Sequence, residues 1–76
     1  MADTVWELTE YFEDAPAETT LFHSEAAAHA DLAARARDGG LPEEYFDPSD
    51  SDTEIAITML AFWRQEMVLE LREVVR

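Results

Sequence analysis

The chain has 76 residues, of which 18 are acidic and only five, all arginines, are basic, so its formal net charge is −13. This length predicts one domain (residues 1–76) with a modest core, and the absence of cysteine excludes a disulfide framework or a thiolate zinc site. The charge argues against direct binding to nucleic acid or to an anionic membrane, and no apolar run is long enough to span a bilayer.

The first 23 residues predict a β-hairpin. Residues 4–12, "TVWELTEYF", alternate in polarity as a strand does, although Glu10 interrupts the apolar face. Pro16 lies in a turn-forming stretch, and residues 19–23, "TTLFH", are suited to a returning strand. The two faces of the first strand carry Trp6, Leu8 and Phe12 on one side and Val5 and Tyr11 on the other.

Residues 25–37, "EAAAHADLAARAR", predict a helix that Ser24 caps and that the following "DGG" ends. Its apolar face is thin, so the helix can approach a sheet closely but adds little apolar area. Glu25 and His29 are four residues apart, and we expect an exposed pair on one helix face rather than half of a zinc site. The predicted apolar face consists of Ala28, Leu32 and Ala36.

A second helix is predicted from Asp52 to about Gln65, because "SDTE" fits a capping box in which Ser51 and Glu54 bond to each other's backbone. The tail "MVLELREVV" is ambiguous. As a strand it places Met67, Leu69, Leu71 and Val75 inward and Glu70 and Arg72 outward; as a helix it continues the preceding one.

We favour the strand, because a hairpin of two strands is marginal without a third. The prediction is therefore an α+β fold of order ββααβ with a three-stranded antiparallel sheet. The alternative is a β-hairpin, a short helix and one long C-terminal helix.

The aromatic residues on the apolar stripes are expected in the core: Trp6, Phe12, Phe22, Phe62 and Trp63. His23, at a strand end, is expected at the rim. The chain has no cysteine, no lysine, no glycine-rich phosphate loop and no nucleophile-elbow serine, so we predict no enzymatic activity and no cofactor.

Residues 40–54, "GLPEEYFDPSDSDTE", are rich in carboxylates and contain no base; we call them the acidic segment. Asp50, Asp52 and Glu54 have the spacing that opens an EF-hand loop, but Ile55 and Ala61 occupy the positions of its glycine and bidentate glutamate. Helix capping explains the pattern better, and no metal site is predicted.

Tyr45 and Phe46 lie between two prolines in the acidic segment. They either pin the segment onto the sheet or anchor a partner within an acidic rim. The predicted partner-binding residues are Glu43, Glu44, Tyr45, Phe46, Asp47, Asp50 and Asp52.

Three stretches, "TVWELTEYF", "SEAAAHADLAARAR" and "LELREVV", give the chain a pattern that resembles small acidic accessory proteins of phages and plasmids from GC-rich bacteria. That resemblance implies an anti-defence role, as in inhibitors of restriction or CRISPR systems, some of which mimic DNA. It assigns no role to any individual residue.

These observations together predict a cytoplasmic, non-enzymatic protein whose acidic face docks on a basic protein or nucleoprotein complex of the host. Two alternatives stay open. One is a structural, self-associating protein, such as a homodimer, because small domains often complete their core by oligomerising. The other is a halophilic protein whose acidity is an adaptation to salt.

Overall fold

The computed structural model describes residues 2–75 and has the predicted α+β architecture. Three strands and two main helices follow one another in the order ββααβ, which confirms the predicted order and the strand at the C-terminal end. The elements are β1 (Ala2–Glu10), β2 (Glu18–Phe22), α1 (Glu25–Arg35), the π-helical turn η1 (Ala36–Gly40), the 3-10 turn η2 (Glu43–Tyr45), α2 (Asp52–Phe62) and β3 (Met67–Val75).

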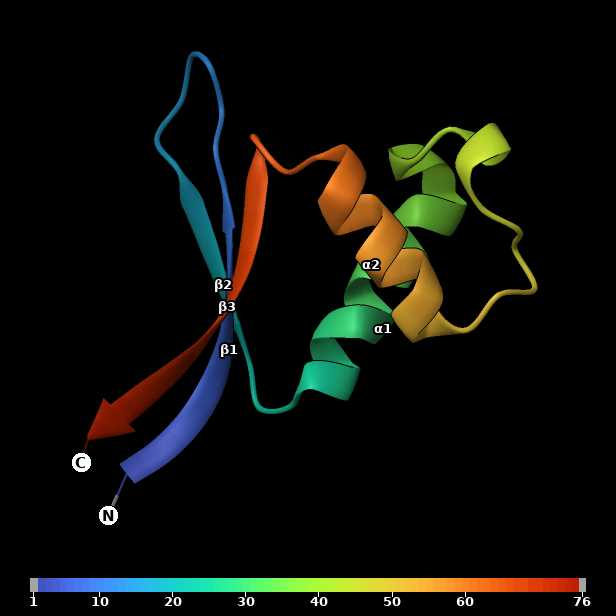
Figure 1. Ribbon diagram of the computed structural model, residues 1–76. Coiled ribbons are helices and arrows are strands. Elements are labelled where there is room, and N and C mark those ends of the chain that lie inside the picture. Colours follow the sequence, from blue (N-terminus) through green and yellow to red (C-terminus); the bar gives the residue numbers. More distant parts are fainter. Residues whose placement is uncertain (1, 76) are drawn as a thin grey trace.

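The strands form one antiparallel sheet of order β2-β1-β3, so the first strand of the chain lies at its centre (Figure 1). Leu8 of β1 is opposite Thr20 on β2 and Leu69 on β3. Directly opposed residues project from the same face, so the alternation in "TVWELTE" sets the face on which Leu8 lies buried. That face is the one that the helices cover.

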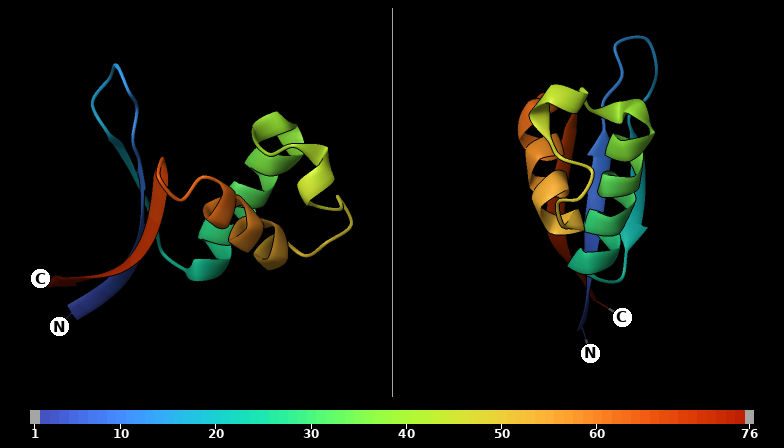
Figure 2. Two further views of the ribbon diagram at one scale, coloured as in Figure 1. Left: turned by 45° about the horizontal axis from the view of Figure 1, so that its top comes forward. Right: turned by 90° about the vertical axis from the view of Figure 1, so that its right-hand side faces the viewer.

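Both helices pack on one face of the sheet and leave the other face open, as Figure 2 shows. They run in the same direction, so the acidic segment returns from the carboxyl end of α1 to the amino end of α2 (Figures 1 and 2). Near the amino ends, His29 Nδ1 lies 3.2 Å from Thr53 Oγ1; at the carboxyl ends, Trp63 Nε1 donates to the Gly40 carbonyl at 2.8 Å.

The same contact corrects one expectation, because His29 is buried and not exposed. The side chain faces α2 and bonds Thr53, a residue 24 positions later. Sequence spacing on one helix carries no information about a neighbour contributed by another helix. The spacing therefore suggested Glu25 as the neighbour of His29, whereas the contact is with Thr53.

The core lies between the sheet and the two helices and is small. Ala28 and Ala33 of α1 are buried, and their short side chains allow α2 to approach closely. The predicted apolar face of Ala28, Leu32 and Ala36 is confirmed, since all three are almost completely buried. The largest fully buried side chains are Leu8, Leu32, Leu41 and Ile55.

The helix boundaries follow from their caps. Ser24 and Ser51 accept hydrogen bonds from the amides of Ala27 and Glu54 at 3.0 and 3.2 Å, so the serine half of the predicted capping box is present. Gly39 has φ of +103°, a conformation that glycine adopts readily, and it turns the chain out of η1.

The helix α2 ends at Phe62, three residues earlier than the predicted Gln65. Trp63 leaves the helical conformation with φ −100° and ψ 25°, and its carbonyl accepts the amides of Glu66 and Met67 at 2.8 and 2.9 Å. No glycine or proline marks this turn. The pairing of β3 with β1 is the long-range interaction that competes with a longer helix, and local propensity cannot show it.

Two of the aromatic residues predicted in the core are exposed: Phe12 at 45% and Phe62 at 39%. β1 ends at Glu10, so Phe12 lies beyond the sheet, and Phe62 packs on Tyr45 at the surface. Leu71, predicted to face inward, is 57% exposed, because β3 is an edge strand and Leu71 has a neighbour in the sheet, Trp6, on one side only. Val75 was also predicted inward; its side chain is outside the described part of the structure.

Within residues 2–75, no helix is both long and apolar enough to cross a membrane.

Candidate partner-binding surface

The acidic segment is an ordered turn structure with its own hydrogen bonds. η2 is closed by the Tyr45 amide, which donates to the Pro42 carbonyl at 3.0 Å. The next turn is closed twice between Asp47 and Asp50, through backbone (2.9 Å) and through the Asp50 carboxylate (3.1 Å). Ser49 donates its amide and its hydroxyl to Asp47 Oδ1 at 2.9 and 2.8 Å. These contacts restrict the directions in which the carboxylates point.

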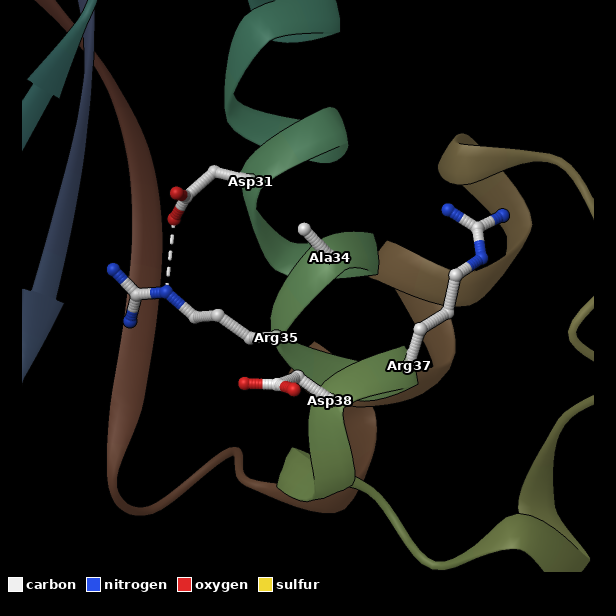
Figure 3. Close-up of a pocket in the computed structure, with 5 residues that line it drawn as sticks. All are labelled: Asp31, Ala34, Arg35, Arg37 and Asp38. Atoms are coloured by element: carbon white, nitrogen blue, oxygen red, sulfur yellow. Dashed lines mark ion pairs between the residues drawn. The ribbon is translucent and has the colours of Figure 1, made fainter.

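Arg37 fastens the acidic segment to the helices. Its guanidinium contacts Asp52 Oδ1 at 2.8 Å, the Asp50 carbonyl at 3.1 Å and the Pro48 carbonyl at 3.4 Å. It lies in η1 and extends away from Asp31 and Arg35, as Figure 3 shows. One side chain thus bonds three residues of the segment, and a planar guanidinium with five donors suits that geometry.

Sequence reasoning missed this clamp, because the acidic segment contains no base of its own. Arg37 stands three residues before Gly40, at the end of the helix predicted over residues 25–37. One feature of the sequence could have indicated the contact: Arg37 lies just before Gly39 and Gly40, where the chain turns back toward the acidic segment.

The predicted carboxylates do not form one uniform patch. Asp52 is paired with Arg37, and Asp47 and Asp50 accept hydrogen bonds inside the segment. Glu43 and Glu44 are exposed and belong to none of the ion pairs among the described residues. The exposed glutamates of the segment that lie outside these ion pairs are therefore Glu43 and Glu44 on η2 and Glu54 in the first turn of α2.

The two aromatic residues of the segment have different positions. Phe46 is partly buried and packs against the core, so it pins the segment in place. Tyr45 is 52% exposed, and its ring centroid lies 5.0 Å from that of Phe62. Phe62 in turn makes an edge-to-face contact with Trp63 at 4.9 Å. Tyr45 and Phe62 therefore present apolar surface directly beside Glu44.

The ordered turn also affects the pKa of Asp47. The backbone amide of Ser49 and, second, its hydroxyl hold the pKa of the Asp47 carboxyl below its ordinary value, because both stabilise the carboxylate. The carboxyl is fully exposed, so the effect reports local geometry and not burial.

A shallow hollow of about 460 Å³ lies beside α1, lined by Asp31, Ala34, Arg35, Arg37 and Asp38 (Figure 3). Arg35 Nε contacts Asp31 at 2.9 Å, and the guanidinium also bonds Glu10 of β1. Burial opposes the charge of Arg35, but the hydrogen bond with Glu10 and the charge of Asp31 outweigh it and raise the pKa of Arg35. Arg37 is bonded to the acidic segment, as described above. Each of the two arginines that line the hollow therefore links its own helix or turn to another part of the chain.

Among the residues that the structure describes, no three carboxylate or imidazole side chains are grouped to hold a metal ion. Comparisons with protein-family models, curated proteins and solved structures found no match to this chain.

Proposed function

We propose that this protein is a non-enzymatic binding module that docks on a basic, nucleic-acid-binding surface of a host defence complex and thereby inhibits it. The observation that carries the proposal is the acidic segment, in which Arg37, the Asp47–Asp50 turn and partly buried Phe46 hold exposed Glu43 and Glu44 beside exposed Tyr45. Fixed negative charge speeds association with a basic surface and selects the partner, whereas an aromatic side chain slows dissociation.

We assign different roles to the seven residues that the sequence predicts to bind the partner. In this proposal Glu43, Glu44 and Tyr45 contact the partner. Phe46 packs against the core and so supports the segment. Asp47, Asp50 and Asp52 act as positioning residues that keep η2 in place.

The test is capture of partners from a bacterial host lysate at low and high salt, followed by association kinetics with the captured complex. The double variant Glu43→Lys/Glu44→Lys is expected to slow association at least tenfold at low salt, because it reverses the charge that steers encounter. Glu13→Lys/Asp14→Lys, in the exposed connection between β1 and β2, changes the net charge equally and serves as the control.

The proposal requires the two variants to differ. If both reversals slow association equally, only net charge is involved, and if neither does, η2 is not the contact. Each of these outcomes removes the acidic segment as the binding surface.

A stricter form of the proposal is DNA mimicry. Duplex DNA presents one charge per strand about every 3.4 Å along its axis. Competition distinguishes the two forms: duplex DNA displaces a mimic from the captured complex, whereas a protein that docks elsewhere on the basic surface remains bound.

A second candidate function is self-association through the uncovered face of the sheet (Figure 2). Leu21 of β2 is exposed, and its partner Glu7 identifies the face on which it lies as the one opposite Leu8. Sedimentation at low concentration tests this candidate with Leu21→Thr, which removes the exposed apolar side chain and introduces a β-branched one that suits a strand. A dimer that the variant dissociates supports it, and a wild-type monomer excludes it.

A further inference from the structure

A second feature of the surface is a cleft of about 260 Å³ where the end of β1 meets the start of β3. It is lined by Glu10, Tyr11, Phe12, Trp63, Glu66 and Met67. The Tyr11 amide donates to the Glu66 carbonyl at 2.7 Å and so joins the two walls. Trp63 is held by its bond to Gly40 and by its contact with Phe62. Two contacts therefore hold the Trp63 ring, and a backbone hydrogen bond holds the chain at Tyr11.

The aromatic side chains of this cleft remain accessible. Tyr11 is 51% exposed, and Phe12 belongs to the exposed aromatics described above. Aromatic faces carry the negative part of the ring quadrupole, which attracts organic cations within about 6 Å of the ring centroid. Three aromatic residues from two segments of the chain thus line one small cleft.

Two further sources of negative potential reach the same cleft. Glu66 is exposed and belongs to none of the ion pairs within residues 2–75, whereas Glu10 is paired with Arg35. Trp63 caps the carboxyl end of α2, whose last turn contains no basic residue. The carboxyl end of a helix carries a partial negative charge that attracts cations within about one turn. The aromatic residues, the Glu66 carboxylate and the helix end therefore all favour a positive ligand, and Arg64, which follows Trp63, is not among the lining residues.

The size of the cleft restricts that ligand further. Sites for drug-sized molecules are usually about 300–1,000 Å³, so this cleft suits a single side chain better than a cofactor. A guanidinium is planar, stacks on aromatic rings and donates two parallel hydrogen bonds to a carboxylate. Lysine offers neither the plane nor the paired donors.

We propose that this cleft binds the side chain of an arginine presented by the partner protein, with the guanidinium against the aromatic rings and paired with Glu66. The inference rests on the proposed function for the existence of a basic partner, but it uses none of the residues of the acidic segment. The cleft gives the interface a specificity pocket in addition to the charged loop.

The experiment is a titration of the ¹⁵N-labelled protein, followed by NMR, with three small probes: N-acetyl-arginine amide, N-acetyl-lysine amide and N-acetyl-citrulline amide. Citrulline has nearly the shape of arginine without its charge, and lysine has the charge without the plane. The arginine probe is expected to shift the signals of Tyr11, Trp63 and Glu66. It should bind at least tenfold more tightly than the citrulline probe and several-fold more tightly than the lysine probe.

Two variants locate the binding in the cleft. Phe12→Leu removes one ring and Glu66→Gln removes the carboxylate charge, and each is expected to weaken binding of the arginine probe at least threefold. Glu13→Gln, one residue from Phe12 but outside the cleft, should leave binding unchanged. The comparison of probes uses the wild-type protein, so it remains valid even if a variant folds poorly.

Equal binding of the arginine and lysine probes would reduce the site to nonspecific charge and overturn the proposal. Equal binding of the arginine and citrulline probes would overturn it by excluding cation recognition. Shifts confined to residues 43–52 would do so by placing the ligand elsewhere. The outcome is independent of the charge reversal at Glu43 and Glu44, so failure of the cleft and failure of the acidic segment are distinguishable.

Discussion

At the scale of single residues, Arg37 has the largest influence on the acidic segment, because one side chain contacts three of its residues. An exposed ion pair contributes at most about 1 kcal/mol to global stability, so its effect is mainly local. The position of Glu43 and Glu44 depends on this local order, since η2 is connected directly to the turn that Arg37 holds.

Replacing Arg37 with alanine should loosen the acidic segment without unfolding the domain. We expect the free energy of unfolding to fall by less than about 1 kcal/mol, while hydrogen exchange of the Asp50 amide accelerates several-fold. Arg72→Ala is the matched control, because it removes an exposed ion pair with Glu7 far from the segment in sequence. Equal exchange of the Asp50 amide in both variants would show that Arg37 does not order the segment.

The ionisation of Asp47 provides a second test at this scale. Its pKa is depressed in the folded state. The contribution of its charge to the stability of the fold is therefore fully present above the ordinary value of 3.8 and is lost as the pH falls through the lower folded value. A ¹³C NMR titration of the carboxyl should therefore have its midpoint below 3.8.

Ser49→Ala should move this midpoint upward but not completely, because the larger cause, the backbone amide of Ser49, remains. A wild-type midpoint at or above the ordinary value would mean that the turn around Asp47 is not formed in solution.

At the scale of elements, the sequence predicted what depends on periodicity and caps and missed what depends on neighbours. The alternation around Leu8, the alanine face of α1 and the cap at Ser51 were all predicted correctly, since each is encoded within a few residues. The end of α2 and the exposure of Phe62 were not, because they are determined by the pairing of β3 with β1 and by the contact with Tyr45.

The candidate site shows the same limit. The composition of the acidic segment identified a charged surface, but it could not separate Glu43 and Glu44 from carboxylates that are already engaged, such as Asp52. That distinction needs the position of Arg37. The cleft at Tyr11 and Trp63 joins residues 52 positions apart, and no spacing rule brings them together.

The packing of α1 can be tested with one substitution at two sites. Leu32 is completely buried between α1 and the rest of the core, so Leu32→Ala should cost about 2–5 kcal/mol. A domain this small has only a few kcal/mol of stability, so the variant should be largely unfolded at room temperature. Leu71→Ala, at an exposed position of β3, should cost less than about 1 kcal/mol. Thermal unfolding followed by circular dichroism measures both, and equal costs would contradict the described core.

At the scale of the whole molecule, the protein is extended for its size. The radius of gyration is 13.1 Å, whereas a compact chain of this length is expected to have about 11 Å. The dimensions of 43 × 32 × 17 Å agree, because the helices stand to one side of the sheet and the β1–β2 connection projects from it (Figure 1). An extended shape spreads the net charge of −13 over more surface and so limits self-repulsion.

The response to salt separates functional acidity from salt adaptation. Exposed charges are screened beyond about 10 Å at about 0.1 M salt, so moderate salt should raise the melting temperature by a few degrees. If the acidity serves binding, circular dichroism should still show a cooperative unfolding transition at low-millimolar salt. Loss of that transition until molar salt is restored would favour the halophilic alternative and weaken the case for a basic partner.

The central position of β1 has a consequence for how the domain is made. Ala2 pairs with Val75, so β1 emerges from the ribosome long before β3, the strand that completes its pairing. Until then β1 has only β2 beside it, and an isolated hairpin is marginal in water. Cooperative folding of this domain therefore has to follow the synthesis of β3, and premature termination before Met67 should yield a polypeptide that proteases remove rather than a weakened version of the domain.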